Sequence, residues 1–313
     1  MTERAPAAPR GGDRLRRAAY LAGLALGGGL LVYQAWRGVA ALAELGWQGL
    51  DPAWLAAAGG LSLIGVGLQM LGWLSLSNGI GTRLTVRQAT EGYFVSFLPR
   101  YIPGLVWGYL GRGEWLFQNY GIPYALSSYG STVEIVAVLT SNILTLAACL
   151  ALTTAEAPAG WAVLVAWIAG LLAPGWLIGR IFALRADSGM AAPAGWARIS
   201  RGWMGGVIAF QMVWLCYGAS TAAIFSALGL GDHVNVFSIT AAFCLAWLAG
   251  FVLIFVPAGL GIRESVLANL ILPIGGLLSE QASLVAVTSR LLIVLSEVLW
   301  VVVGSLARVI GKY

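Results

Sequence analysis

The chain has 313 residues, 59% of them hydrophobic and only 10% charged, with a formal net charge of +5. A soluble domain is about one-quarter charged, so this composition excludes a soluble globular protein and predicts a polytopic membrane protein. All but one of the basic residues are arginine. We interpret their excess as loop charge that sets membrane orientation rather than as a surface for nucleic acid.

The chain begins with a polar stretch, residues 1–17, that contains five arginines. We expect a disordered, basic, cytoplasmic tail here. After it we expect a single all-α transmembrane domain at residues 18–310, a helical bundle of about seven or eight spans with one or two broken segments. The continuous spans are predicted at residues 18–36, 53–77, 131–152, 161–178, 203–228, 236–256 and 284–307.

Residues 89–116 mix apolar side chains with prolines, glycines and charges. The basic loops at residues 79–90 and 179–202 are both expected in the cytoplasm, and two spans already separate them. Residues 89–116 should therefore enter and leave the membrane on the same face, as broken, re-entrant half-helices. Residues 265–278 have two interpretations, a short span or a second re-entrant segment, and these place the C-terminus on opposite sides.

The first charged constellation is FLPRYIPGLVWGYLGRGEW, residues 97–115. Its predicted helix-breaking residues are Pro99, Pro103 and Gly104. The prolines remove backbone donors and disfavour helix just before them. Arg100 and Arg112 are candidate ligands for an anion at this break. The alternative is an ordinary interfacial loop whose arginines extend to the lipid headgroups.

The second constellation is FVPAGLGIRE, residues 255–264, which separates two apolar runs. Its predicted break residues are Pro257, Gly259 and Gly261. A helix that begins near Ile262 places Glu264 in its first turn, where the helix dipole favours a carboxylate. Arg263 has no such reason to be there, and we interpret it as a candidate anion ligand. The alternative is a positive-inside charge that pairs locally with Glu264.

Three further charges lie inside predicted spans: Glu134, Arg290 and Glu297. Arg290 and Glu297 are seven residues apart, which places them on nearly one helix face. Glu297 is near the middle of an apolar run, where an ionised carboxylate costs at least ~2.5 kcal/mol, so it must face protein or water, or be protonated. The three side chains are predicted either to clamp helices together or to line a translocation cavity.

The sequence contains no motif of a soluble enzyme: no P-loop, no G-x-S-x-G and no H-E-x-x-H. We therefore expect a protein that is not an enzyme and that needs no cofactor or metal. A membrane-embedded transferase with Glu264 or Glu297 as a base is the weaker alternative.

The segments YIPGLVWGYLGRGEWLFQNYGIP and PAGLGIRESVLANLIL together resemble the lysylphosphatidylglycerol synthase transmembrane-region family, a flippase-like module of bacterial lipid-modifying proteins. The matching residues here are Pro103, Gly104 and Arg112, then Pro257, Gly259, Gly261, Arg263 and Glu264, and finally Arg290. Many members have an acidic-basic pair in the third span. This chain has Glu134-Ile135 there, so the resemblance carries no ion-pair role over to Glu134.

The resemblance implies a membrane module without the soluble aminoacyltransferase domain of fused relatives. It implies a multi-pass protein of the bacterial inner membrane, with a cytoplasmic N-terminus, that handles or translocates a charged lipid such as a phospholipid or a polyprenyl-phosphate-linked glycan. Four arginines would bind the lipid phosphate or its counter-charges, and three carboxylates would balance them. These residues are Arg100, Arg112, Arg263, Arg290, Glu134, Glu264 and Glu297.

The alternative function is a non-transporting scaffold for an envelope glycosyltransferase or a lipid-modifying enzyme. The expected partners are therefore membrane lipids or such an enzyme. A second copy of the chain is a further candidate partner, and nucleic acid is not one.

Overall fold

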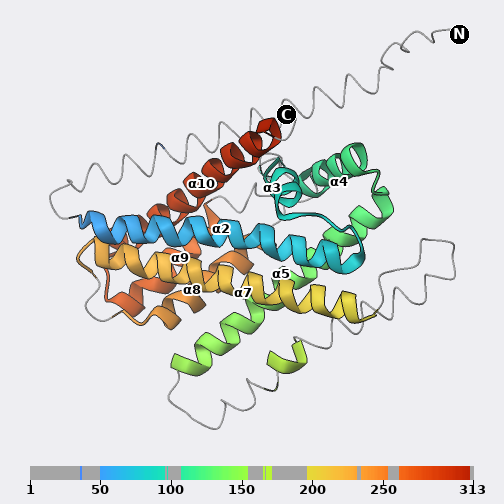
Figure 1. Cartoon of the computed structure of the whole chain (residues 1–313). Helices are drawn as coiled ribbons and strands as arrows, with labels where there is room; N and C mark the ends of the chain where they lie inside the picture. Colours follow the sequence, from blue (N-terminus) through green and yellow to red (C-terminus); the bar gives the residue numbers. More distant parts are fainter. Residues whose placement is uncertain are drawn as a thin grey trace, which may run out of the picture.

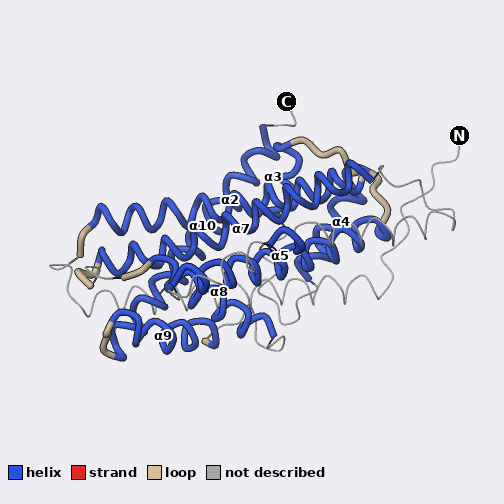
Figure 2. The backbone as a smooth tube through the Cα atoms, turned by 90° about the horizontal axis from the view of Figure 1, so that it is seen from below, coloured by secondary structure: helices blue, strands red, loops and turns tan. Residues whose placement is uncertain are grey.

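The computed structural model describes residues 36, 50–95, 97, 107–153, 165, 167–170, 196–230, 234–252 and 261–310. Its regular elements in this part of the chain are helices throughout (Figure 2). The helices are α2 (Pro52–Ile80), α3 (Val86–Val95), α4 (Trp107–Tyr120), α5 (Tyr124–Thr153), α7 (Trp196–Ala227), α8 (Val236–Val252), α9 (Ile262–Gly275) and α10 (Ser279–Ile310). The predicted all-α fold class is confirmed.

Long apolar helices identify the chain as a membrane protein. Four described helical stretches are long and apolar enough to cross a bilayer, and the shorter Val236–Val252 is apolar as well. The four stretches are Pro52–Ile80, Tyr124–Thr153, Ala197–Ala227 and Ser279–Leu306. The predicted span at residues 18–36, apart from Trp36, and most of the span at residues 161–178 lie outside the described residues.

Three predicted helix starts were too late. Helix α5 begins at Tyr124 rather than at residue 131, α7 begins at Trp196 rather than at residue 203, and α10 begins at Ser279 rather than at residue 284. Arg198 and Arg201 therefore belong to a helix and not to the predicted loop. The guanidinium of Arg201 donates to the carbonyl of Ala197, 3.2 Å away on the preceding turn, so the arginine fits the helix without interrupting it.

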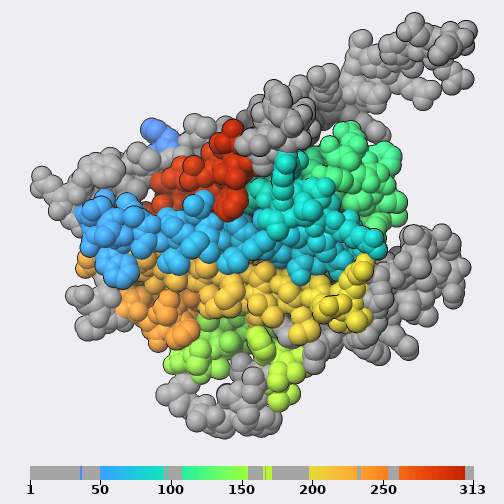
Figure 3. All heavy atoms as spheres, in the orientation of Figure 1, coloured from blue at the N-terminus to red at the C-terminus, as the bar shows by residue number. Residues whose placement is uncertain are grey.

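Helices α2 and α7 form the central pair of the bundle. They run side by side along its length, with α10 above them and α5 crossing below in Figure 1. In the space-filling view they appear as two adjoining bands, blue to cyan and yellow (Figure 3). The other helices pack around this pair.

Small residues let α2 and α7 approach closely. A seam of small residues recurs at every seventh position of α2, which keeps it on one helix face. The seam is Ala58, Gly65, Gly72 and Gly79. A Cβ on Gly72 would lie 3.1 Å from the ring of Phe210, and a Cβ on Gly79 would lie 3.0 Å from the Cα of Gly202. Close contact between backbones is how helices associate in lipid, where the hydrophobic effect does not drive them together.

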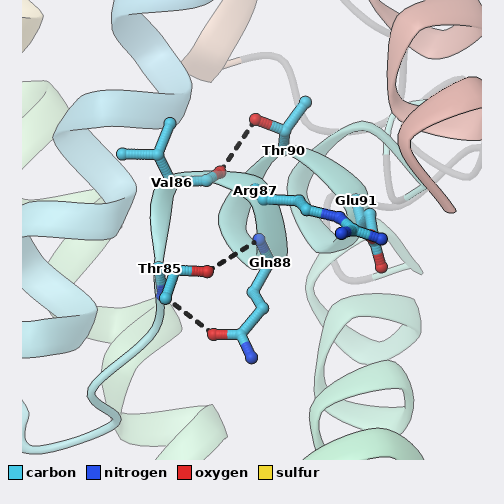
Figure 4. A network of polar contacts seen from close by, with 6 residues as sticks. All are labelled: Thr85, Val86, Arg87, Gln88, Thr90 and Glu91. Atoms are coloured by element: carbon cyan, nitrogen blue, oxygen red, sulfur yellow. Dashed lines mark hydrogen bonds and ion pairs between the residues drawn. The ribbon is translucent and has the colours of Figure 1, made fainter. Parts of the chain in front are cut away.

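Helix α3 begins with a capping box. The backbone N–H of Gln88 donates to Thr85 Oγ1 (3.3 Å), and the backbone N–H of Thr85 donates to Gln88 Oε1 (2.8 Å), as Figure 4 shows. These two bonds satisfy N–H groups that the first turn of a helix leaves without partners. An ion pair between Arg87 and Glu91 (3.4 Å) follows on the same helix.

The segment predicted to be broken is broken. Helix α3 ends at Val95, and α4 is a separate helix. Phe97 lies in a turn, and its backbone N–H donates to the carbonyl of Phe94 (3.1 Å). At 1.5 Å per residue, α3 and α4 are about 15 and 21 Å long, so neither crosses a hydrocarbon core of about 30 Å. The predicted break residues Pro99, Pro103 and Gly104, together with Arg100, lie outside the described residues.

The second predicted break separates α8 from α9. Pro257 and Gly259 lie outside the described residues, whereas Gly261 is the residue before α9 and has a φ of 80°, which glycine adopts without strain. Helix α9 is about 21 Å long and is joined to α10 by a tight turn at Gly276–Leu278, so the two helices form an antiparallel hairpin. This hairpin brings the start of α9 beside the middle of α10.

We predict that Gly202→Ala destabilises the protein by about 1–3 kcal/mol through overpacking. The new Cβ would lie 2.5 Å from the Cα of Gly79 and 2.7 Å from the carbonyl oxygen of Ser75, and both are backbone atoms that cannot rotate away. The measurement is the melting temperature of the purified protein in detergent. Gly60→Ala is the matched control, because its Cβ meets nothing within 4 Å. Equal melting temperatures for the two variants would contradict close packing of α2 and α7.

Candidate functional site

A cavity of about 150 Å³ lies within the bundle, and all eight described helices contribute to its wall. One water needs about 10–15 Å³ of such volume, so the cavity has room for roughly ten water-sized groups. Much of its wall is apolar or aromatic, including Phe210, Trp214, Phe243 and Leu267. A space of this kind suits an amphiphilic ligand better than a freely hydrated ion.

Six charged side chains line this cavity. They are Arg112, Glu134, Arg263, Glu264, Arg290 and Glu297. These are six of the seven residues that the sequence singled out, and the seventh, Arg100, lies outside the described part of the chain. Their three positive and three negative formal charges cancel. The structure brings them together, and their role as ligands for a substrate stays a prediction.

Arg112 of α4 and Glu134 of α5 form the tightest ion pair of the site. Arg112 Nη1 lies 2.6 Å from Glu134 Oε2, and each side chain is only 4% exposed. The guanidinium also lies over the rings of Trp73, Tyr93 and Tyr109, at 5.0, 4.5 and 5.5 Å. A cation over aromatic faces is stabilised by the ring quadrupole, most strongly where water is excluded.

This pair bears on a role that the sequence left in doubt. The resemblance carried no ion-pair role over to Glu134, because the following residue is Ile135. The structure shows that Glu134 does form an ion pair, with a partner on another helix. Spacing along α5 could not identify that partner, because the pair depends on how α4 packs against α5.

Glu264 joins the start of α9 to the middle of α10. Its Oε2 accepts a hydrogen bond from the backbone N–H of Gly261 (2.6 Å), and its Oε1 lies 3.6 Å from Arg290 Nε. The first contact caps the helix as the dipole argument predicted. The second contact is longer than a hydrogen bond. The side chains of Arg290 and Glu264 are 12% and 11% exposed.

Arg263 points toward α8. Its guanidinium lies over the ring of Trp247 at 5.2 Å. A Cβ on Gly250 would lie 2.4 Å from Arg263 Cγ, so the glycine leaves the space that the arginine stem occupies. The neighbouring Glu264 thus has an ion-pair partner on the facing helix, rather than only the adjacent arginine that the alternative interpretation proposed.

Glu297 lies in the interior of α10 and is 9% exposed. It is seven residues from Arg290, about 10 Å along the axis, and both side chains line the cavity. One turn further along the helix, Trp300 stacks on Phe94 of α3, with the two ring centroids 4.9 Å apart.

Sequence reasoning missed the uncharged polar residues of the site. Gln69 of α2 donates to the hydroxyl of Tyr217 (2.5 Å) and accepts from the hydroxyl of Tyr93 (3.4 Å), and all three residues line the cavity. An amide in the middle of an apolar span is itself a signal, because it needs partners at membrane depth. Trp247 gave no such signal, because aromatic residues are common throughout the sequence.

The described residues contain no group of three or more His, Cys, Asp or Glu side chains arranged to hold a metal ion. What the cavity offers a ligand is guanidinium groups, carboxylates, hydroxyls and aromatic faces. Guanidinium groups bind phosphate or carboxylate groups well, because their planar donors match the geometry of those anions.

Comparison with known families gives one match. The family model described as the lysylphosphatidylglycerol synthase TM region matches residues 20–300. This range includes all six charged residues of the cavity. No curated protein matches the chain, and no solved structure does.

We predict that the Arg112–Glu134 pair is strongly coupled. Replacing either partner alone, by Arg112→Met or Glu134→Leu, should cost about 3–5 kcal/mol, because the remaining charge is left buried. The double replacement should recover most of that loss. The measurement is a double-mutant cycle on the melting temperature of the purified protein.

The control cycle uses Arg87→Met and Glu91→Leu, a pair in which the arginine side chain is 52% exposed and the glutamate side chain 14%. Its coupling should be below about 1 kcal/mol. Additive effects at Arg112 and Glu134 would show that the two charges do not depend on one another.

Proposed function

The chain belongs to the lysylphosphatidylglycerol synthase TM-region family, and from this we propose that it is a lipid-handling membrane protein. In this proposal it admits a charged lipid headgroup into its cavity and moves the lipid across the bilayer. The observation that carries the proposal is that six charged side chains from α4, α5, α9 and α10 line one cavity within an apolar bundle. The chain catalyses no chemical step in this proposal.

The physical problem of moving a lipid is the headgroup. A charged group that leaves water for hydrocarbon loses its hydration, and the cost is prohibitive unless other charges or dipoles replace the water. A cavity with fixed guanidinium and carboxylate groups supplies that replacement. Its apolar and aromatic wall suits the part of the lipid next to the headgroup.

The bacterial inner membrane is the proposed location, with the N-terminus in the cytoplasm. The support is the cluster of arginines before the first apolar run, because positively charged flanks stay on the cytoplasmic side. These residues are Arg4, Arg10, Arg14, Arg16 and Arg17.

We predict that the protein moves lipid in a reconstituted system and that this depends on Arg263 and Arg290. The assay follows a fluorescent phosphatidylglycerol in vesicles of phosphatidylcholine and phosphatidylglycerol, with an impermeant reductant that bleaches the outer leaflet. Replacing both residues by alanine should slow the movement by about ten-fold or more, because each charged hydrogen bond contributes at least 1.5 kcal/mol.

The matched control replaces Arg198 and Arg201 by alanine, because both are exposed on α7. An unchanged rate after loss of Arg263 and Arg290 would overturn the assignment of the site. No movement by the intact protein would overturn the transport proposal and favour a scaffold for an envelope enzyme.

A further inference from the structure

The two ends of the cavity hold their charges differently. At the α4–α5 end, Arg112 and Glu134 are 2.6 Å apart, 4% exposed and enclosed by aromatic rings. At the α9–α10 end, Arg290 and Glu264 are 3.6 Å apart, and their side chains are about three times as exposed. Arg263 adds a second guanidinium at this end.

We propose that Arg263 and Arg290 are the anion-binding end of the cavity, and that Glu264 occupies this end as an internal competitor. The phosphate group of the ligand takes the place of the Glu264 carboxylate on Arg290. This inference rests on the proposed function, in which the ligand is a lipid with a phosphate in its headgroup. It assigns Arg112 to holding helices together and not to the ligand.

Arg112 is poorly suited to bind the anionic group of a ligand. Its guanidinium already has a carboxylate at hydrogen-bond distance and three aromatic rings around it. An anion that bound there would have to remove Glu134 from a contact that is both short and buried, and Glu134 would lose its compensating charge. The pair is therefore best understood as a link between α4 and α5.

Glu264 is better suited to give up its contact with Arg290 to an incoming anion. Its contact to Arg290 is longer than a hydrogen bond, whereas its contact to the N–H of Gly261 is short. If an anion takes Arg290, Glu264 keeps its hydrogen bond at the start of α9 and gives up only the weaker contact. The capping bond thus retains the carboxylate near the site, where it competes with the ligand without blocking it permanently.

Arg263 is positioned for the same ligand. Its guanidinium lies over Trp247, and its stem fills the space beside Gly250. Stacking on an aromatic ring fixes the plane of a guanidinium and so orients its N–H donors. Two guanidinium groups from α9 and α10 then face one phosphate.

The test measures binding to the full-length protein in detergent by isothermal titration calorimetry. The probes are dioctanoyl phosphatidylglycerol, inorganic phosphate and dioctanoylglycerol, which lacks phosphate. Glu264→Gln should bind phosphatidylglycerol about ten-fold more tightly than the unmodified protein, because the competing charge is gone. The glutamine carbonyl can still accept the Gly261 N–H, so the helix cap should survive.

Arg263→Gln and Arg290→Gln should each weaken binding by about ten-fold or more. Glu280→Gln and Arg201→Gln are the matched controls, because both residues are exposed and neither lines the cavity. If Glu264→Gln binds as the unmodified protein does, or less tightly, the competitor role is overturned. If Arg290→Gln retains full affinity, the anion-binding end is overturned.

Inorganic phosphate distinguishes the two sources of the anion. If Glu264→Gln binds inorganic phosphate more tightly, the phosphate group alone is recognised. If the gain in affinity is seen with phosphatidylglycerol but not with inorganic phosphate, the acyl chains contribute to binding. Equal binding of dioctanoylglycerol and phosphatidylglycerol contradicts an anion site.

A second pair of variants covers the case in which Glu264→Gln does not fold. Arg290→Lys retains the charge without the planar donors, so it should bind more weakly than arginine and more tightly than Arg290→Gln. Equal affinity of these two variants contradicts the site. Binding that follows the expected order in a protein that moves no lipid would overturn the proposed transport and leave this inference standing.

Discussion

Burying charge in an apolar bundle is the constraint on which the rest of this structure depends. Among the described residues, six charged side chains line one cavity in a chain that is 59% hydrophobic. Each would be costly alone at membrane depth. Arg112 and Glu134 compensate each other only when α4 packs against α5. Each of the two ion pairs links helices that follow one another in the sequence, α4 to α5 and α9 to α10, and the helix packing in turn keeps the charges compensated.

The close pair of α2 and α7 provides the framework for this arrangement. Small residues at every seventh position of α2 let the two backbones approach. Hydrogen bonds along the pair, from Gln69 to Tyr217 and from Ser75 to the carbonyl of Gly202, add to this packing. The short helices are placed around this pair.

Much of the site could be predicted from the sequence, because a charge within an apolar run is conspicuous. Glu134, Arg290 and Glu297 stood out for that reason, and Arg263 stood out because it follows a helix break. The partners could not be predicted. The pairs Arg112–Glu134 and Glu264–Arg290 depend on how helices pack, and a periodic pattern says nothing about which apolar face meets which. Gln69 could have been identified from the sequence, because an amide within an apolar span needs polar partners, whereas the aromatic partners of the arginines could not.

A cavity that takes up a charged ligand and releases it must satisfy two opposing demands. Its own charges must be compensated when it is empty, or the bundle would not be stable, yet some must be available when the ligand arrives. A single tight pair meets only the first demand, and a free guanidinium meets only the second. This cavity contains one short, enclosed pair and one longer pair whose carboxylate has a second contact at the start of α9. Dividing the two demands between two pairs lets one bundle be stable and still exchange a ligand.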